Sequence, residues 1–402
     1  MRVLFISHDA SLLGAPRSLD ALLAEFIRNT EWECRIVIRA RPWKLSKAFS
    51  QYGETYHFYK YGTPRLGILS ALDLMNFIRE IKFNSDPLST VLAPIKQKLH
   101  VKTIREKLSR WEPDLIYSNT AMNGDVIRTL NLNAPVLVHV RELEWFLKTL
   151  DPKRRQALRS DPAFYFAVSE AVKRNLLEKH HLDANKIGVV HVGINPRRVM
   201  DHSREISSQN IRKQLGFEPD TIVVGTVGRV DRRKGSDLFV GVATEMLKQL
   251  GTDSKIAFMW VGDGPDRAFV TQALRRQGVV DKLRMIGMQE NPYPYINCID
   301  ILFTPSRDDP FPRVNLEAGL LGKPVVAFEN SGGSVEFIGN DCGFALPGFD
   351  TKVAAESIIR LIANPALRES FGRCARNKVK KLYSIKVIAR NARNLIAKHF
   401  GI

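Results

Sequence analysis

The sequence predicts an α/β protein with two doubly wound, parallel-sheet domains. Short, almost wholly apolar runs alternate with amphipathic helical patterns from one end of the chain to the other. The alternation stops at a polar stretch and then restarts. The length of 402 residues suits two or three domains. A composition of 44% hydrophobic and 25% charged residues excludes a disordered tail or a collagen-like fibre.

The first half contains short runs that are apolar throughout, which is typical of strands buried on both faces of a parallel sheet. The expected strands are Val3–Ile6, Cys34–Ile38, Leu115–Tyr117, Val136–Val140, Phe164–Val168 and Ile187–His191. Helical patterns lie between several of them, for example Ser18–Arg28 and Ser169–Lys179. Helices at these places would cover the sheet.

A polar and charged stretch, Asn195–Pro219, follows and is interpreted as a linker. After it the alternation restarts, with expected strands at Thr221–Val227, Ile256–Val261, Leu283–Ile286, Asp300–Phe303 and Pro324–Phe328. Expected helices are Ser236–Gln249, Asp266–Arg276, Asn315–Leu320 and Val353–Leu361. The restart predicts two domains facing one another across a cleft, with ligands beyond the carboxyl ends of the strands.

The charge balance is strongly basic, since 60 Lys and Arg against 42 Asp and Glu leave a net charge of +18. Such a surface favours nucleic acid, an anionic membrane or phosphorylated ligands. The cysteines Cys34, Cys298, Cys342 and Cys374 are scattered and form no CxxC pair. We therefore expect no zinc site or disulfide framework, and a cytoplasmic location. No signal peptide or membrane-spanning run is visible in the sequence, so we expect a soluble chain or one lying on a membrane.

The segment Val227–Gly235 carries the first site motif, a strand that runs into a basic loop before a helix. Arg229 and Lys234 are placed to converge on an anionic group near the helix start. The alternative is a surface basic loop, because Arg232 and Arg233 lie among them. Gly262–Pro265 also follows a strand, but it lacks the third glycine of a dinucleotide fingerprint and is interpreted as a tight turn.

The second site motif is Pro305–Gly319, in which Asp309 and Glu317 stand eight residues apart. The loop-borne Asp309 and the helix-borne Glu317 are candidates for one pocket. The backbone amides of Arg313 and Val314, at the expected helix start, are candidates to receive phosphate oxygens. The alternative for Asp309 is that it caps the turn.

Five features follow one another in the second half: GRxxxxKG, GDGP, a strand ending in Pro-Ser, the acid-x7-Glu pair and EAGLLGKPVVAF. Together they resemble the retaining glycosyltransferases of family 4. These are GT-B-type enzymes with a nucleotide-sugar donor. The resemblance covers the second domain and, more loosely, the opening loop, the His139 region and Val168–Ser169 of the first. It implies two facing Rossmann-like domains, 1–195 on the acceptor side and 196–384 on the donor side. The last helix, within 385–402, would pack back on the first domain.

The resemblance assigns the donor diphosphate to Arg229 and Lys234, and the donor ribose to Glu317. It gives Asp309 contacts with the donor sugar; Glu is commoner at that position, and the Asp side chain is one methylene shorter. Pro312 stands where Gly is common and removes one backbone donor. Two fixed cations would stabilise the leaving diphosphate without a metal, so neither metal nor cofactor is expected.

In the first domain the resemblance points to Gly14 and His139. Gly14 belongs to a loop that approaches the diphosphate or the acceptor, and His139 would contact the donor sugar. A structural histidine at a strand end is the alternative for His139. The resemblance implies front-face attack, in which the departing phosphate takes the acceptor proton, and we nominate no catalytic base.

A basic amphipathic pattern covers Leu92–Trp111, with apolar residues at helical spacing among lysines and arginines. It suits an anionic bilayer surface, which favours a lipid-linked acceptor and a peripheral position on the inner face of the cytoplasmic membrane. The alternative is a core-facing helix with a solvated basic face.

The leading hypothesis is therefore a cytoplasmic, retaining, metal-independent hexosyltransferase that builds a cell-surface polysaccharide from a nucleotide sugar. The alternative is a polyanion-binding protein without chemistry, a nucleic-acid binder for example, which only the charge supports. A nicotinamide-dependent oxidoreductase lacks the glycine fingerprint after the first strand.

Overall fold

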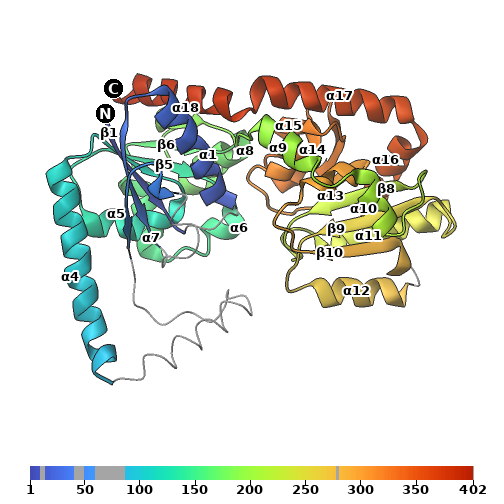
Figure 1. The fold of residues 1–402 in the computed structure, drawn as a ribbon, viewed down its shortest axis with the longest axis horizontal. Coiled ribbons are helices and arrows are strands. Elements are labelled where there is room, and N and C mark those ends of the chain that lie inside the picture. The colour runs from blue at the N-terminus through green and yellow to red at the C-terminus, as the bar shows by residue number, and fades with distance from the viewer. Residues whose placement is uncertain (10–13, 40–48, 59–86, 278–279, 402) are drawn as a thin grey trace. The chain divides into compact units, whose positions relative to one another are not determined.

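The computed structural model describes residues 1–9, 14–39, 49–58, 87–277 and 280–401. It contains two parallel sheets with helices on them (Figure 1). The strand order is β3-β2-β1-β4-β5-β6-β7 in a seven-stranded sheet and β10-β9-β8-β11-β12-β13 in a six-stranded sheet. The predicted class, α/β with two Rossmann-like parallel-sheet domains, is confirmed.

The seven-stranded sheet uses every strand that the first half predicts. Its strands are β1 (Arg2–Ser7), β2 (Glu33–Ile38), β3 (Glu54–His57), β4 (Leu115–Ser118), β5 (Val136–Val140), β6 (Phe164–Ala167) and β7 (Ile187–Val189). The sequence analysis missed β3 because this edge strand has a single buried side chain, Tyr56, and no apolar run. The strand order reverses between β1 and β4, where Ile6 pairs with Ser118.

Helices connect these strands, and polar side chains start several of them. The helices are α1 (Gly14–Asn29), α4 (Pro87–Trp111), α5 (Gly124–Leu130), α6 (Glu144–Leu147), α7 (Pro152–Ser160) and α8 (Glu170–His180). Ser169 caps α8, since its hydroxyl accepts the amide of Val172 at 3.1 Å. Asp151 caps α7 in the same way, with Pro152 as the first helical residue.

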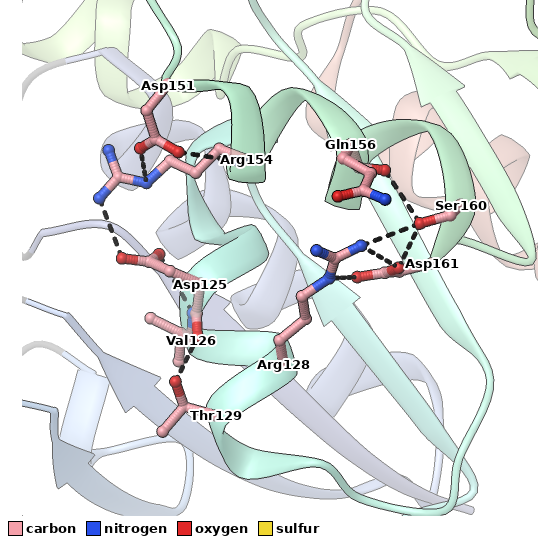
Figure 2. A network of polar contacts seen from close by, with 9 residues as sticks. All are labelled: Asp125, Val126, Arg128, Thr129, Asp151, Arg154, Gln156, Ser160 and Asp161. Atoms are coloured by element: carbon pink, nitrogen blue, oxygen red, sulfur yellow. Dashed lines mark hydrogen bonds and ion pairs between the residues drawn. The ribbon is translucent and has the colours of Figure 1, made fainter.

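Two arginine–aspartate clusters fix α5 against α7 (Figure 2). In one, Asp125 lies 2.9 Å from Arg154 and 3.1 Å from Arg39. In the other, Arg128 donates to both carboxylate oxygens of Asp161, at 2.6 and 2.9 Å. A bidentate pair of this kind fixes orientation as well as distance.

Aromatic side chains form part of the core between the six-stranded sheet and its helices. Its strands are β8 (Ile222–Val227), β9 (Ile256–Val261), β10 (Leu283–Gly287), β11 (Ile301–Thr304), β12 (Val325–Phe328) and β13 (Gly343–Leu346). Phe239 packs on Trp260 and Phe303, with ring centroids 5.2 and 6.1 Å apart. The helices are α11 (Ser236–Leu250), α12 (Arg267–Arg276), α13 (Tyr293–Cys298), α14 (Arg313–Leu320), α15 (Ser334–Ile338) and α16 (Thr351–Ala363).

The stretch interpreted as a linker contains two short helices, α9 (Pro196–Ser203) and α10 (Ser208–Gln214). Asn195 caps α9, with Pro196 as its first residue, and Ser207 caps α10. The polar composition that suggested a linker thus comes largely from helix caps and solvated faces. Val199 and Ile211 are the buried contacts that hold the two helices.

The chain ends in two long helices, α17 (Pro365–Leu382) and α18 (Ile385–Phe400). Ile194 hydrogen-bonds the backbone on both sides of Ser384, which separates them. The ring of His399 in α18 packs on Phe164 of β6 in a tilted arrangement, with centroids 3.9 Å apart. Residues Met1–Leu23, Ile27–Val138 and Asp151–Ala163 form one compact unit, and Ala24–Phe26, His139–Leu150 and Phe164–Ile402 form another. The domain boundary at residue 195 stays a prediction.

Candidate functional site

The two site motifs follow neighbouring strands at the point where the strand order of the six-stranded sheet reverses. The motif of Arg229 and Lys234 follows β8, and the motif of Asp309 follows β11. β8 and β11 are adjacent and parallel, with Leu302 beside Gly225, so both motifs leave the same edge of the sheet. In open α/β sheets this reversal is the general place for a ligand.

The loop after β8 depends on Gly235. This residue has φ +76°, and a β-carbon on it would overlap the carbonyl oxygen of Pro305, in the loop after β11. Glycine therefore permits both the left-handed turn and the close approach of the two loops. The Asp231 carboxylate accepts the amide of Lys234 at 2.8 Å and fixes the end of the turn.

Lys234 and Asp309 form an ion pair across the two loops. The Lys234 ammonium lies 2.5 Å from Asp309 Oδ2, and Ser306 donates its hydroxyl to the same oxygen at 3.3 Å. The Asp309 side chain is 8% exposed. The N-cap of α14 is Pro312, so the carboxylate does not cap that helix, but its contact with Ser306 lies within its own turn and the turn-capping alternative stays open.

Glu317 is held by a second ion pair within α14. Arg313 Nε donates to Glu317 Oε1 at 2.9 Å, and the Tyr293 hydroxyl lies 3.4 Å from the same oxygen. Burial opposes the charge on Arg313, but Glu317 and Tyr293 outweigh it and raise the pKa of the guanidinium. Arg313 is therefore a permanent cation, and its Nη1 also contacts the carbonyl oxygen of Gly193 at 3.5 Å.

The start of α14 presents backbone amides beside these pairs. The helix begins at Arg313, as the placement of the Arg313 and Val314 amides required. Its N-cap, Pro312, has no side-chain acceptor for the amides of the first turn. The local arrangement suits an anion, although binding of the diphosphate there stays a prediction.

Arg229 differs from the other cations of the site in its exposure. Its side chain is 56% exposed, and its Nε lies 3.4 Å from Asp231 Oδ2. The neighbouring arginines hold the loops instead: Arg233 donates to the carbonyl of Asp308 at 2.7 Å, and Arg307 pairs with Asp237. Arg229 and Arg232 are both exposed, so Arg229 is accessible to a ligand and the surface basic-loop alternative stays open.

The GDGP segment has the structural role that its incomplete fingerprint predicted. β-Carbons on Gly262 and Gly264 would overlap backbone atoms of Gly228 and Val230. The amide of Val230 donates to the carbonyl of Asp263 at 3.1 Å. This tight turn therefore packs against the backbone of the loop that carries Arg229.

His139, at the end of β5, is fully buried and neutral. One ring nitrogen, Nε2, lies 2.9 Å from the carbonyl oxygen of Val190, and Arg141 Nη2 lies 3.1 Å from Nδ1. The first contact requires a hydrogen on Nε2, so Nδ1 accepts from Arg141. Burial, helped by the Arg141 charge, lowers the pKa of His139 well below its usual value. Its predicted contact with a donor sugar stays a prediction.

Gly14 begins α1, next to the order reversal of the seven-stranded sheet. It has φ +57°, and a β-carbon there would meet no atom within 4 Å among the described residues. The preceding part of its loop, residues 10–13, lies outside the described residues. The role of Gly14 at the diphosphate or acceptor stays a prediction.

The sequence analysis did not identify four residues that complete this region. Tyr293 and Ser306 contact the two site carboxylates, and Asp308 accepts the Trp145 amide at 3.1 Å. Glu336 accepts the amides of Glu170 and Ala171, at 2.9 and 3.0 Å, and lies 3.0 Å from His191 Nε2. Only Ser306 had a local signal, because it directly follows a strand within the motif.

Comparisons with known proteins cover nearly the whole chain. The family model "Glycosyltransferase Family 4" matches residues 14–198, and "Glycosyl transferases group 1" matches residues 207–378. Alpha-D-kanosaminyltransferase of Streptomyces kanamyceticus is 27% identical over 171 residues, 42% of this chain and 43% of that protein. The capsular polysaccharide biosynthesis glycosyltransferase CapM of Staphylococcus aureus is 25% identical over 233 residues, 55% of this chain and 58% of CapM. The chain thus spans about half the length of these relatives.

Solved structures match this chain over nearly its full length at low sequence identity, so they show the fold alone. Anabaena Alr3699/HepE in complex with UDP superposes with a TM-score of 0.74 at 18% identity, covering 99% of this chain and 100% of that one. WaaG, a glycosyltransferase involved in lipopolysaccharide biosynthesis, gives a TM-score of 0.68 at 14% identity, covering 98% and 99%. With both halves matched by glycosyltransferase models, the chain belongs to the glycosyltransferases of family 4 and has their GT-B-type fold.

Proposed function

We propose that this chain transfers a hexose from a nucleoside diphosphate sugar to a glycan acceptor in the synthesis of a cell-surface polysaccharide. The observation that carries the proposal is that two ion pairs, Lys234–Asp309 and Arg313–Glu317, lie in the segments that follow the adjacent strands β8 and β11, with the exposed Arg229 in the first segment. Two relatives act in capsular polysaccharide and lipopolysaccharide core biosynthesis, and structural neighbours bind UDP and UDP-glucose.

Each group has a chemical task in this reaction. The bond from the sugar C1 to the diphosphate breaks while the acceptor oxygen bonds to C1, and the electron pair leaves with the diphosphate. Arg229, Lys234 and the amides of Arg313 and Val314 would stabilise the negative charge that grows there. Glu317 would accept the ribose hydroxyls, Asp309 would contact the sugar, and His139 would contact it from the end of β5.

The cations of the site are held in internal pairs before a donor binds. Lys234 lies on Asp309, and Arg313 lies on Glu317. A diphosphate carries more charge than one carboxylate and would draw Lys234 away from Asp309, freeing that carboxylate for the sugar hydroxyls. Lys234 would thus change partner when the donor binds, and both cations would be in position before the reaction step.

We further propose retention of the anomeric configuration without a metal ion. Front-face attack requires no protein nucleophile, and the departing phosphate oxygen takes the acceptor proton. Two fixed cations at the diphosphate supply the charge that a metal would otherwise provide.

The test uses water as the acceptor, so it does not depend on knowing the natural one. UDP-, GDP-, dTDP- and ADP-α-glucose are incubated with the protein in EDTA, and the freed sugar is followed by NMR. The proposal expects one donor to give the α-anomer first, with Arg229→Ala inactive and Arg232→Ala, in the same loop, active. Release of the β-anomer first, a need for Mg²⁺, or no release from any donor would contradict it.

We also propose a lipid-linked acceptor at an anionic membrane surface. Among the described residues, no helix has the length and apolar composition needed to cross a bilayer. In α4, Ile104, Leu108 and Trp111 are buried in the protein, which leaves Leu99, 59% exposed, and a basic face for a surface. Exposed cations of that face include Lys102, Arg105, Lys107 and Arg110.

Vesicle sedimentation tests this surface contact. Phosphatidylglycerol vesicles should bind the protein and phosphatidylcholine vesicles should not. Replacing Lys102 and Arg105 by Ala should weaken binding about fivefold for each charge removed. The matched control replaces Arg275 and Arg276, exposed cations of α12. Equal loss in both double variants, or no binding by the wild type, would contradict the proposal.

A further inference from the structure

Trp145 is a large aromatic side chain that stands in solvent beside the candidate site. Its exposed fraction is 42%, whereas the side chains of Leu143 and Leu147, on either side of it in the chain, are buried. Tryptophan side chains are normally largely buried or in contact with a partner. The exposed Trp145 indole is therefore a candidate to contact a ligand.

The backbone under Trp145 is tied to the loop that carries the site acids. The amide of Trp145 donates to Asp308 Oδ2 at 3.1 Å, and Asp308 is the direct neighbour of Asp309. Burial raises the pKa of Asp308, while the Trp145 hydrogen bond and Arg233 favour its charged form. The Trp145 ring thus belongs to a segment whose backbone is hydrogen-bonded to Asp308, the residue next to Asp309.

Three further contacts hold α6 in place. His180 Nε2 lies 3.1 Å from Glu144 Oε2, and Asn175 donates to the same oxygen at 3.5 Å. The Leu143 side chain packs so closely on Gly332 that a β-carbon there would overlap it. Gly332 in turn pairs with Asp309 through a backbone bridge. Trp145 therefore lies on a segment held by several contacts, and ordering this segment on binding costs little conformational entropy.

The face of the ring is a ready contact for a sugar. Lys148 Nζ lies over the ring, 5.4 Å from its centroid, and the side chain remains 42% exposed. A pyranose has an apolar C–H face and a polar rim, and so matches an indole with a cation beside it. The acceptor must reach C1 of the donor sugar, which the proposed function places at Asp309.

We propose that Trp145 is the platform on which a pyranose of the acceptor glycan stacks, with the Lys148 ammonium near the polar rim of the pyranose. Trp145 is a specificity-determining residue here, since it orients the acceptor and takes no part in bond breaking. The inference rests on the proposed function, because it takes the position of the donor sugar from it. The occupant is a neutral or anionic sugar ring of the acceptor.

The experiment measures glycan binding with UDP present, on an immobilised panel of mono- to tetrasaccharides. Wild type should bind at least one glycan, and Trp145→Ala should weaken that binding about tenfold. Trp145→Tyr, which keeps an aromatic face, should retain most of it. Phe269→Ala is the matched control, because it removes another exposed ring, 52% exposed, from α12.

The outcomes separate this inference from the function on which it rests. Thermal stabilisation by a nucleoside diphosphate should be the same in wild type and Trp145→Ala, which also shows that the variant folds. If that stabilisation is intact but Trp145→Ala binds glycans as wild type does, or wild type binds none, the platform is overturned alone. If no nucleotide stabilises wild type, the proposed function fails first.

Discussion

Lys234 and Asp309 lie 75 residues apart in sequence, yet their side chains form a 2.5 Å ion pair that joins the loops after β8 and β11. The pair places one cation and one carboxylate of the predicted site in mutual contact. It also means that a diphosphate has to compete with Asp309 for Lys234. Because of this competition, the Asp309 carboxylate lowers the affinity for the nucleotide, whereas it assists sugar transfer.

We therefore expect Asp309→Asn to bind free nucleoside diphosphate more tightly while transferring sugar more slowly. Removing the carboxylate releases Lys234 and lowers the negative charge near the phosphates. Calorimetric titration with UDP, GDP, dTDP and ADP measures the first effect, about fivefold or more in the dissociation constant. Asp220→Asn removes an exposed charge paired with Lys255 and should leave the constant unchanged. Weaker nucleotide binding by Asp309→Asn would contradict the competition.

Gly235 should be intolerant of a side chain for a steric reason beyond its φ of +76°. Gly235→Ala forces the new β-carbon into the Pro305 carbonyl, separates the two site loops and should abolish nucleotide binding. Gly401→Ala is the matched control, because Gly401 has φ +72° and ψ +22° in the same left-handed region, with open space around it among the described residues. The control should cost only the strain of a left-handed residue, about 1–2 kcal/mol. Equal losses of stability, with nucleotide binding kept in both, would show that the loops tolerate separation.

The buried, neutral His139 predicts a loss of stability in mild acid. Its folded-state pKa is depressed, so below its ordinary pKa of about 6.5 the unfolded chain binds a proton that the folded protein does not. Stability from this group is present above that pH and falls as the pH decreases, by up to about 1.4 kcal/mol per pH unit.

Urea unfolding at pH 7.5 and pH 5.5 measures this effect. His139→Gln should be less stable than wild type at pH 7.5 but lose less on acidification, since glutamine does not titrate. His100→Gln, at an exposed histidine of α4, should keep the wild-type pH dependence. An unchanged pH dependence in His139→Gln would mean that another group carries the acid sensitivity.

The two arginine–aspartate clusters of Figure 2 should differ in what they contribute to stability. Asp125 faces Arg39 and Arg154, whose side chains are mostly buried, so Asp125→Asn leaves two cations together and should cost about 3 kcal/mol. Asp161→Asn breaks a pair whose arginine, Arg128, is 39% exposed, and should cost about 1 kcal/mol or less. Chemical denaturation of both variants measures the difference, and a larger loss for Asp161→Asn would reverse the ranking.

Much of the fold could be predicted because parallel strands in a two-faced sheet are apolar runs, and runs such as Val136–Val140 and Ile256–Val261 can be identified directly. β3 and β13 could not be predicted, since each is short and only partly buried. The α9–α10 region was mistaken for a linker because its caps and solvated faces gave it the composition of a loop.

Candidate site residues could be proposed where they lie within one motif, as Arg229 and Lys234 do in one and Asp309 and Glu317 do in another. The contacts that complete it join residues far apart in the chain. Glu336 meets the amide of Glu170 across 166 residues, and Trp145 meets Asp308 across 163. No local pattern encodes such pairs, because they arise only when the strands and helices have been packed together.

The central claim, that the residues after β8 and β11 hold a nucleoside diphosphate, is tested most directly by thermal stabilisation with UDP, GDP, dTDP and ADP in EDTA. Wild type and Arg232→Ala should be stabilised by the same nucleotide, with about 2.7 kcal/mol added at a hundred times its dissociation constant. Arg229→Ala and Glu317→Ala should lose that stabilisation. If no nucleotide stabilises the wild type, and nucleic acid binds with a steep salt dependence that Glu317→Ala does not change, the protein is a polyanion binder and the account is wrong.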